Sequence, residues 1–246
     1  MDILEDIRVL SFNHFLLGPM GTQVLADLGA DVICVEPVGG AFQRHWGGAN
    51  HRIDGDTMLH LCGNRNKRSL AVDMKSKEGS EIVAKLISTA DVLSENFRPG
   101  VMDKLGFGYD SVRQINPKLI YAAASGYGQD GPYSERPGQD LLIQSLSGLA
   151  NITGSENQPP TAVGVSAVDH HGAQILAMSI LAALFHRERT GKGSRVDVDL
   201  LSAALDLQNE SLVCYANGCE QSQRPPPNIA GWYFPAPYGI YTVRDG

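Results

Sequence analysis

Asp169 is the residue with the clearest potential for chemistry. It stands in the stretch AVDHHGAQIL, residues 167–176, beside His170, His171 and Gly172, where a long apolar helix is expected to begin. An aspartate before a helix is commonly an N-cap. The same place suits a nucleophile, because a helix N-terminus favours an ionised carboxylate and its free N–H groups can stabilise an oxyanion. Gly172 would let a substrate approach the backbone closely, and the histidines are candidate bases.

A cluster of basic residues precedes one of the predicted strands. The segment NRNKRS, residues 64–69, contains Arg65, Lys67 and Arg68. Most such clusters are solvated turns, but arginine forks and a lysine point charge also clamp phosphates. The chain carries a net charge of −7, so a local basic patch beside a sheet edge favours an anionic ligand.

The segment ENFRPGVMDKLG, residues 95–106, repeats this theme at the end of a predicted strand. Asn96 offers an amide, Phe97 an aromatic face, and Arg98 and Lys104 two positive charges. An aromatic ring suits a base and cations suit its phosphates. The two basic segments together predict a nucleotide-binding cleft.

Two other signatures are weak or missing. The turn GPMGT contains Gly18 and Gly21, and Glu36 ends the next predicted strand, which imitates a dinucleotide fingerprint. The spacing is not GxGxxG, however, and Pro19 removes a backbone donor, so NAD binding is disfavoured. No GxSxG motif occurs, which argues against a serine hydrolase of the α/β type.

Composition sets broad limits on the class of protein. Hydrophobic residues make up 43% and charged residues 19% of 246, as in ordinary soluble proteins. The acidic charge argues against a nucleic-acid surface, the start MDILEDIRVL has no signal-peptide pattern, and the best apolar run, within 173–185, is too short to span a membrane. Four scattered cysteines indicate reduced thiols and no metal site. We expect a cytoplasmic protein without membrane or nucleic-acid partners.

The order of predicted elements indicates the fold. Strands alternate with helices, and each strand–helix–strand unit needs a right-handed crossover between parallel strands. We therefore expect an α/β fold with an open, mostly parallel, Rossmann-like sheet and helices on both faces. The glycine- and proline-rich loop 125–140 follows a strand end, where ligands gather in such sheets. Strands are predicted over 7–12, 31–37, 68–74, 91–97, 118–125 and 194–201, and helices over 18–30, 77–90, 109–116, 141–152 and 171–189.

The chain is expected to contain a large α/β domain and the start of a smaller one. Residues 1–205 form the predicted large α/β domain with the nucleotide-binding cleft, 206–237 a linker rich in proline and glycine, and 238–246 the beginning of a small domain. The last segment, YGIYTVRDG, has the pattern of a strand that lacks a partner. We therefore expect the natural chain to continue, or this product to be truncated.

These segments together resemble the class III CoA-transferases, which include formyl-CoA and carnitine-type CoA-transferases and the 2-methylacyl-CoA racemases. The resemblance covers residues 4–246. Each segment alone is weakly specific, but all five in order are highly specific. They are GPMGTQVLADLGADVICVEP, NRNKRSLAVDM, ENFRPGVMDKLGFGYD, RPGQDLLIQSLSGLANITG and ILAALFHRERTGKGSRVDVDLL.

The resemblance implies covalent catalysis by Asp169, with Gln139 and Asp140 also at the catalytic site. Asp169 would attack the acyl-CoA, and CoA would return to give an aspartyl-CoA thioester. CoA and acyl-CoA enter as substrates, a small carboxylic acid is the acceptor, and no tightly bound cofactor is expected. The resemblance also implies an interlocked homodimer. The residues implied to surround CoA are His14, Phe15, Leu16, Asn64, Arg65, Lys67, Arg68, Asn96, Phe97, Arg98 and Lys104.

The sequence departs from its relatives at the predicted catalytic residues. The racemases carry a histidine at the position of Gln139, and a glutamine amide cannot act as that base, so racemisation is disfavoured. Formyl-CoA transferases carry tyrosine and glutamate in place of Gln139 and Asp140, and glutamine in place of Leu16. An apolar Leu16 indicates an acyl group larger or less polar than formate or oxalate. Family members also extend well beyond residue 246.

Three hypotheses remain open from the sequence. The leading one is an acyl-CoA:carboxylate CoA-transferase. The second is an acyl-CoA racemase or epimerase that uses Asp169 with His170 or His171. The third is a truncated chain that binds CoA without turnover.

Overall fold

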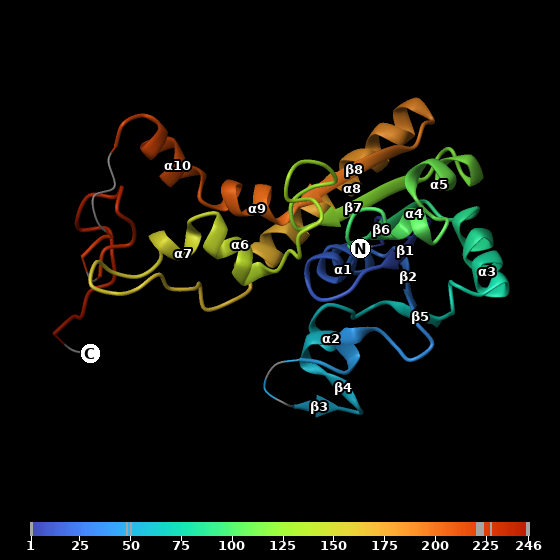
Figure 1. Ribbon diagram of the computed structural model, residues 1–246, viewed down its shortest axis with the longest axis horizontal. Coiled ribbons are helices and arrows are strands. Elements are labelled where there is room, and N and C mark those ends of the chain that lie inside the picture. The colour runs from blue at the N-terminus through green and yellow to red at the C-terminus, as the bar shows by residue number, and fades with distance from the viewer. Residues whose placement is uncertain (1, 48, 50, 220–223, 227, 245–246) are drawn as a thin grey trace.

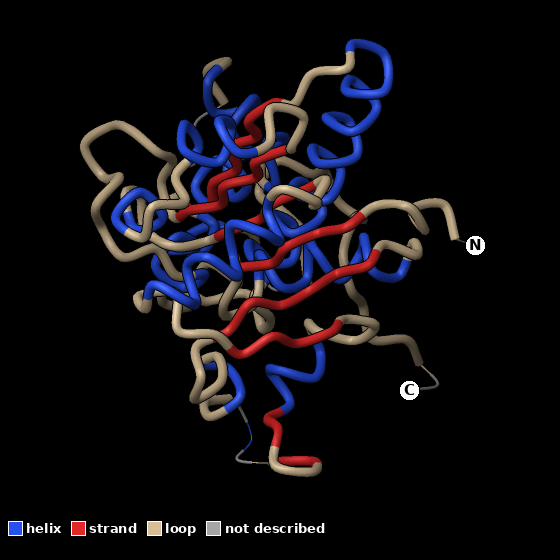
Figure 2. Tube along the Cα trace, turned by 90° about the vertical axis from the view of Figure 1, so that its right-hand side faces the viewer, coloured by secondary structure: helices blue, strands red, loops and turns tan. Residues whose placement is uncertain are grey.

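Six strands form one parallel sheet in the part of the molecule that lies on the right in Figure 1. The computed structural model describes residues 2–47, 49, 51–219, 224–226 and 228–244. The strand order is β5-β2-β1-β6-β7-β8, and all neighbouring pairs are parallel, which confirms the expected fold class. Figure 2 shows the strands following one another in a twisted sheet. They are β1 (Arg8–Phe12), β2 (Asp31–Glu36), β5 (Arg68–Ala71), β6 (Val92–Glu95), β7 (Ile120–Ser125) and β8 (Ser194–Asp199).

The strand order reverses between β1 and β6. From β1 the chain builds outward through β2 to β5, and it then returns to β6, which pairs with the other side of β1. In open parallel sheets, ligands bind beyond the carboxyl ends of the strands at such a reversal. The loops that follow β1 and β6 therefore occupy the preferred place for a binding site.

Helices cover both faces of the sheet. Successive strand residues point to opposite faces, so Val9 and Val92 share one core with α1 and α8, whereas Leu10 and Leu93 share another with α3, α4 and α5. The long helix α8 lies on the same face as α1. The bounds are α1 (Leu17–Asp27), α3 (Lys77–Ile87), α4 (Val101–Lys104), α5 (Tyr109–Ile115) and α8 (Ala167–Thr190).

Two glycines allow α1 and α8 to pack closely. A Cβ on Gly172 would lie 2.8 Å from Leu17 Cδ1, and a Cβ on Gly21 would lie 2.9 Å from Leu176 Cδ2. The space beside Gly172 is thus filled by Leu17. The expectation that Gly172 opens the backbone to a substrate is wrong, because its hydrogen makes room for the neighbouring helix.

Helix α8 is the one described helix that is long and apolar enough to cross a membrane, and it is longer than the apolar run expected over 173–185. A buried core helix has the same length and composition. Its contacts with α1, β7, β8 and α9 (Leu200–Leu207) are those of such a core helix, with Leu176 and Ile180 fully buried.

The prediction missed several short elements. The helix expected over 141–152 is two helices, because Gly148 between them has a left-handed backbone with φ of 89°. Between β2 and β5 lie a 3-10 turn, a small hairpin and a helix, whose polar sequence carried no clear period. The missed elements are η1 (Phe42–Arg44), β3 (Arg52–Ile53), β4 (Asp56–Thr57) and α2 (Met58–Cys62), and the two halves are α6 (Asp140–Leu146) and α7 (Leu149–Ile152).

The C-terminal part differs from the predicted linker and strand. Helix α9 (Leu200–Leu207) is followed by α10 (Asn209–Ala216), which lies inside the segment 206–237 expected as a linker. Residues 220–223 and 227 of that segment, and residues 245–246 of the last one, lie outside the described residues. From 238 to 244 the chain forms no strand, only an isolated bridge between Gly239 and Ile229. A lone strand has no partner for its backbone groups, so it does not form here.

Candidate active site

Asp169 lies in the first turn of α8, but it does not cap that helix. The helix begins at Ala167, earlier than residue 171 as predicted, and the N-cap is Ser166, whose side chain makes no capping hydrogen bond. Asp140 Oδ1 accepts hydrogen bonds from the backbone N–H of Val168 at 2.8 Å and of Asp169 at 3.0 Å. The interpretation of Asp169 as the N-cap is therefore wrong. The capping carboxylate comes from Asp140, so the Asp169 side chain is not used for capping and is available for catalysis.

Gln144 holds the capping carboxylate in place. Its Nε2 donates to Asp140 Oδ2 at 2.5 Å, and its Oε1 accepts from the Val163 backbone N–H at 2.9 Å. The same Nε2 lies 3.3 Å from the carbonyl of Val165. Gln144 is fully buried, so this network fixes the segment that leads into α8 against α6.

The environment of Asp169 disfavours its charge. Burial, together with the smaller effect of the negative charge of Asp140, raises the pKa of its carboxyl to about 7. His170 and the backbone N–H of Leu17 act in the opposite direction. The Asp169 carboxyl is therefore half-buried and only partly ionised at neutral pH.

The two loops at the strand reversal are joined by Asn96. Its Oδ1 accepts from the His14 backbone N–H, and its Nδ2 donates to the His14 carbonyl, both at 2.8 Å. The amide predicted to contact CoA is thus engaged in bridging the loops after β1 and β6. The His14 ring also lies 5.3 Å from the Phe97 ring. Two of the predicted CoA residues from distant segments are thereby brought together.

An aromatic cluster extends from this bridge and was not predicted as a unit. Phe15 has a left-handed backbone with φ of 57°, and its ring lies 5.2 Å from Phe42 and 6.0 Å from Trp46. Phe42 and Trp46 are about half exposed. These two residues follow β2 in a segment without periodicity. Their aromatic side chains were the only sequence signal that could have predicted them as part of the site. Leu16, next to Phe15, is buried and precedes α1.

The basic cluster 64–69 does not form a single clamp. Lys67 is largely buried, and its Nζ donates to the carbonyls of Pro19 and Gly63, to Thr22 Oγ1 and to Asn64 Oδ1, at 2.6–3.0 Å. Burial lowers the pKa of Lys67 to about 8. Asn64 is likewise engaged, since its Nδ2 donates to the His60 carbonyl.

The two arginines of that cluster lie at the other end of the sheet. Arg65 pairs with Asp27 at 2.5 Å, and Arg68 pairs with Asp31 at 2.7 Å. Asp27 ends α1 and Asp31 begins β2, so both pairs lie beside the amino ends of the strands. The structure does not bring Arg65 and Arg68 to the carboxyl edge where Asn96 and Phe97 lie.

Arg98 and Lys104 are placed differently. Both are exposed, both follow the carboxyl end of β6, and neither makes an ion pair with any residue that the structure describes. Their charges are thus available to an anionic ligand beside the Phe97 ring.

Glu36, the acid of the partial dinucleotide-binding motif, binds groups of its own chain. Glu36 is buried, and it accepts from Arg44 at 2.6 and 2.8 Å, from the Ala41 backbone N–H and from Ser69. Although burial acts to raise its pKa, these hydrogen bonds and the Arg44 charge lower the pKa of Glu36 to about 2. It binds its own chain and does not face a ribose.

The remaining candidates surround Asp169 without contacting its carboxylate. Gln139 is exposed at the N-cap of α6 and makes no capping bond with its side chain. His170 Nδ1 lies 2.8 Å from the Ser166 carbonyl, and His171 Nε2 lies 2.7 Å from Asp206 Oδ2. Both imidazoles have hydrogen-bond partners of their own, so neither is arranged as the second base of a racemase.

The fold and the site together define an open parallel α/β protein with a carboxylate nucleophile candidate beside the strand reversal. The family model for CoA-transferase family III matches residues 4–246, and the chain belongs to this family. The resemblance drawn from the sequence is thereby confirmed.

Curated relatives and solved structures agree with this assignment. The chain is 38% identical over 98% of its length to the acetyl-CoA:oxalate CoA-transferase of Acetobacter aceti, of which it covers 61%. It is 37% identical over 99% of its length to the succinyl-CoA–D-citramalate CoA-transferase of Chloroflexus aurantiacus, of which it covers 60%. The crystal structure of a CAIB/BAIF family protein from Brucella suis superposes with a TM-score of 0.87 at 36% identity. That match covers 98% of this chain and 63% of the other. The chain thus spans about three fifths of the proteins it matches.

Proposed function

We propose that this protein transfers CoA from an acyl-CoA thioester to a free carboxylic acid, with Asp169 as the nucleophile. The observation that carries the proposal is the position of the Asp169 carboxyl. It is half-buried in the first turn of α8, and a different carboxylate satisfies the helix start. Relatives named as CoA-transferases between acyl-CoA and carboxylate support the reaction class.

The reaction runs through four acyl exchanges. The Asp169 carboxylate attacks the thioester carbonyl, which gives a mixed anhydride and releases CoA thiolate. The thiolate attacks the aspartyl carbonyl of the anhydride, which gives an aspartyl-CoA thioester and releases the donor acid. The acceptor carboxylate attacks that thioester and again displaces the thiolate. The thiolate then attacks the acceptor's acyl carbonyl, which completes the new acyl-CoA and restores Asp169.

The chain's own groups assist these steps in distinct ways. The backbone N–H of Leu17 favours the charged form of the Asp169 carboxyl, so it stabilises the carboxylate that attacks. Asp140 holds the helix start and keeps the nucleophile fixed. Phe97, Arg98 and Lys104 lie at the neighbouring strand end, where a ring and two free cations suit the nucleotide part of CoA.

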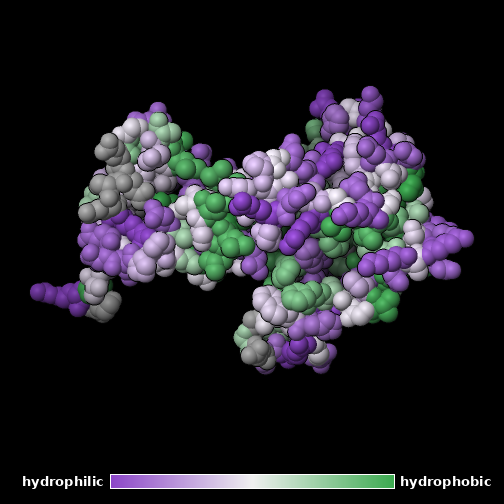
Figure 3. Space-filling model, viewed as in Figure 1, coloured by the Kyte–Doolittle hydropathy of each residue, from purple (hydrophilic) through white to green (hydrophobic). Residues whose placement is uncertain are grey.

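We also infer that the protein forms a homodimer. Helices α6, α9 and α10 carry large apolar side chains that are between 38% and 57% exposed, and Figure 3 shows a hydrophobic area over α6 and α9. A continuous exposed apolar area of this kind is typical of an interface between protein chains. The residues are Leu141, Leu142, Leu146, Leu205, Leu207 and Val213. Sedimentation that shows a monomer at every protein concentration would contradict the inference.

Trapping of the acyl-enzyme tests the nucleophile. The protein is incubated with an acyl-CoA, treated with hydroxylamine, digested and analysed by mass spectrometry. Hydroxylamine should convert Asp169 to its hydroxamate, because anhydrides and thioesters react with it and a free carboxylate does not. The Asp169→Ala variant should carry no label. Asp130→Ala, which removes an exposed aspartate of the loop after β7, should label as the wild type does.

The other two hypotheses give different results in the same preparation. An epimerase would exchange the 2-hydrogen of an acyl-CoA with deuterium from heavy water, whereas a transferase would not. A chain that binds CoA in calorimetry but never acquires the Asp169 label would be a CoA-binding protein without turnover. Normal CoA exchange by Asp169→Ala would overturn the proposed function.

A further inference from the structure

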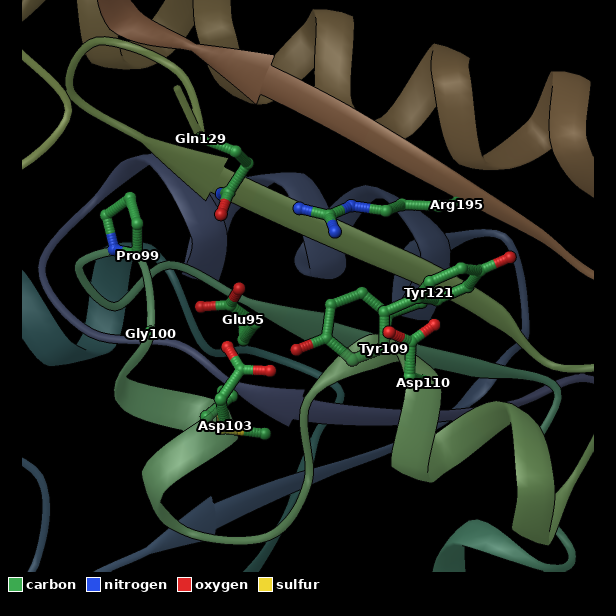
Figure 4. Close-up of a pocket in the computed structure, with 10 residues that line it drawn as sticks. Glu95, Pro99, Gly100, Asp103, Tyr109, Asp110, Tyr121, Gln129 and Arg195 are labelled. Carbon is green, nitrogen blue, oxygen red and sulfur yellow. The ribbon is translucent and has the colours of Figure 1, made fainter. Parts of the chain in front are cut away.

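Two cysteines at the end of α10 take no part in the proposed reaction. Cys214 lies in the last turn of the helix and Cys219 follows it, and both are free thiols. The cavity of about 230 Å³ beside α4 is different, because it is lined in part by the segment between Arg98 and Lys104 and so belongs to the region proposed to hold the nucleotide (Figure 4). Figure 1 shows α10 far from α4, so the two thiols are separate from that region.

The turn that ends α10 brings the two cysteines together. Gly218 has a left-handed backbone with φ of 89°, and its N–H donates to the Tyr215 carbonyl at 3.1 Å. The Cys219 N–H donates to the Cys214 carbonyl, also at 3.1 Å. This pair of bonds defines a Schellman motif, in which the side chains at the positions of Cys214 and Cys219 commonly contact one another. A backbone bond between two residues also keeps their Cα atoms within the span of roughly 4–7 Å that a disulfide bridges.

The spacing of the two cysteines would not bring their thiols together without this turn. In an uninterrupted helix, residues five apart point about 140° apart around the axis, so the side chains of Cys214 and Cys219 would face different sides. The left-handed turn at Gly218 instead returns Cys219 to the end of the helix. The space around Gly218 is open, since a Cβ there would meet nothing within 4 Å. The backbone conformation of Gly218, and not packing around it, therefore decides whether the thiols meet.

Both thiols are within reach of a small reagent. Cys219 is exposed and Cys214 is partly exposed. Cys214 lies one turn after Glu210, which accepts a hydrogen bond from the Tyr233 hydroxyl at 3.1 Å. Burial, the hydrogen bond with Glu210 and the smaller effect of a charged Cys214 raise the pKa of Tyr233, so Cys214 lies on the side of α10 that faces Tyr233. Its neighbour Val213, by contrast, belongs to the apolar area of the proposed dimer.

We propose that Cys214 and Cys219 form a reversible disulfide, which makes the end of α10 a site of modification by low-molecular-weight disulfides. The exposed Cys219 thiolate attacks glutathione disulfide, which gives a mixed disulfide and releases one glutathione thiolate. The Cys214 thiolate then attacks Cys219 Sγ, which forms the internal disulfide and releases the second glutathione thiolate. The two protein thiols are oxidised and the oxidant is reduced to two thiols, which take up the two protons that the protein thiols lose. A dithiol reductant reverses both steps.

Equilibration in glutathione buffers with increasing glutathione disulfide tests the pair. After acid quenching and alkylation, trypsin leaves both cysteines in one peptide, because no lysine or arginine lies between them. The mass of this peptide shows whether the thiols are alkylated, joined to glutathione or joined to one another. We expect the internal disulfide, with an effective concentration of the two thiols about tenfold or more above that of the same chain unfolded in urea. Equal values for the folded and the unfolded chain would overturn the proposal.

Substitutions at Gly218 test whether the turn holds the thiols together. Asparagine accepts the left-handed backbone, whereas a β-branched residue does not, and the open space admits either side chain. Gly218→Asn should therefore keep most of the effective concentration, and Gly218→Val should lower it by about tenfold, toward that of the unfolded chain. An unchanged value in Gly218→Val would mean that the turn does not bring the thiols together.

Single-thiol variants identify the bond. Cys214→Ser should stop at the mixed disulfide of Cys219 with glutathione, and Cys219→Ser should form no internal disulfide. Cys62→Ser, which removes a different exposed thiol, should form the disulfide as the wild type does. Asp169→Ala should do so as well, which separates this site from the proposed transferase site. Glutathione adducts without an internal disulfide in the folded wild type would contradict the proposal.

Discussion

Asp140 stabilises the helix that carries Asp169 and also makes Asp169 harder to ionise. Its Oδ1 accepts a hydrogen bond from the Asp169 backbone N–H at 3.0 Å, and its charge raises the pKa of the Asp169 carboxyl. The first effect requires an oxygen acceptor at this position, and the second requires a negative charge. Substitution by asparagine removes the charge and the oxygen that accepts from Gln144, but keeps one oxygen for the two backbone N–H groups, whereas substitution by alanine removes all of these.

The Asp140→Asn variant should change the pH dependence of acylation. Asp169 must be ionised to attack, so trapping of the acyl-enzyme should speed up as the pH rises through about 7 in the wild type. Without the charge of Asp140, the pKa of Asp169 falls, and the midpoint of the rise should move to lower pH. The rate of hydroxylamine trapping across a pH series measures this. Asp130→Asn is the control, and an unmoved midpoint in Asp140→Asn would contradict the electrostatic role.

The Asp140→Ala variant should lose stability because the start of α8 loses its cap. Removal of a capping side chain costs about 1–2 kcal/mol, and Asp140→Asn should cost clearly less because an amide oxygen remains. Urea denaturation at about pH 5, where Asp169 is largely protonated and the repulsion is weak, isolates the capping effect. If alanine and asparagine proved equally stable there, the hydrogen bonds to Val168 and Asp169 would not matter for the helix.

Asp169 should cost the folded protein stability at neutral and alkaline pH. Its pKa is about 7 in the folded state and near its ordinary value of 3.8 when unfolded, so the folded state holds the proton more tightly. The cost is therefore fully present above about pH 7, shrinks as the pH falls, and disappears below about pH 4. Asp169→Asn should raise the free energy of unfolding by about 1–3 kcal/mol at about pH 8. An equal rise in the free energy of unfolding at low pH would show that the cost does not come from the charge of Asp169.

Gly172 should not tolerate a side chain. A Cβ there would lie 2.8 Å from Leu17 Cδ1, so Gly172→Ala forces the buried Leu17 side chain to move and should cost about 1–3 kcal/mol despite the better helix propensity of alanine. Gln174→Ala, on the exposed side of the same helix, is the control and should be neutral or slightly stabilising. Combining Gly172→Ala with Leu17→Ala should restore part of the loss. Thermal denaturation of the wild type, these three variants and Leu17→Ala alone measures the losses. A double variant that loses as much stability as the two single variants together would contradict the contact between Gly172 and Leu17.

The sheet and its main helices could be predicted because their signals are local. Runs such as IRVLSF and DVICVEP mark strands through apolar residues next to one another, and turns with glycine end the helices. The short elements between β2 and β5 could not be predicted, because they are too brief to show a period. The long apolar helix was found, but its first turn was not, since Ala167 to His170 is polar enough to read as a loop.

The site was predictable in its residue types but not in its pairings. Asp169 was identified from the sequence. Asp140, which caps its helix, lies 29 residues away, and no motif in either segment predicts the contact. The basic residues of segment 64–69 carry the same charge, but Arg65 pairs with an acid 38 residues earlier and Arg68 pairs with an acid 37 residues earlier. Long-range partners decide which charges stay free, and a single sequence does not reveal them.

The unpaired cations, Arg98 and Lys104, should therefore affect CoA binding more than the paired arginines, Arg65 and Arg68. The double variant Arg98→Met/Lys104→Met removes two unpaired cations beside Phe97. We expect CoA to bind about 10–100-fold more weakly, because each contact of an exposed cation contributes less than the about 1.5–3 kcal/mol of a buried charge-assisted hydrogen bond. Arg65→Met/Arg68→Met breaks exposed ion pairs at the other end of the sheet, which are worth at most about 1 kcal/mol of stability, and should leave the affinity within about twofold. Calorimetry with CoA and with pantetheine, which lacks the nucleotide, separates the contribution of the nucleotide to binding from that of the thiol arm. Pantetheine should bind equally to both variants. An equal loss of CoA affinity in the two double variants would mean that the nucleotide is not held at the end of β6.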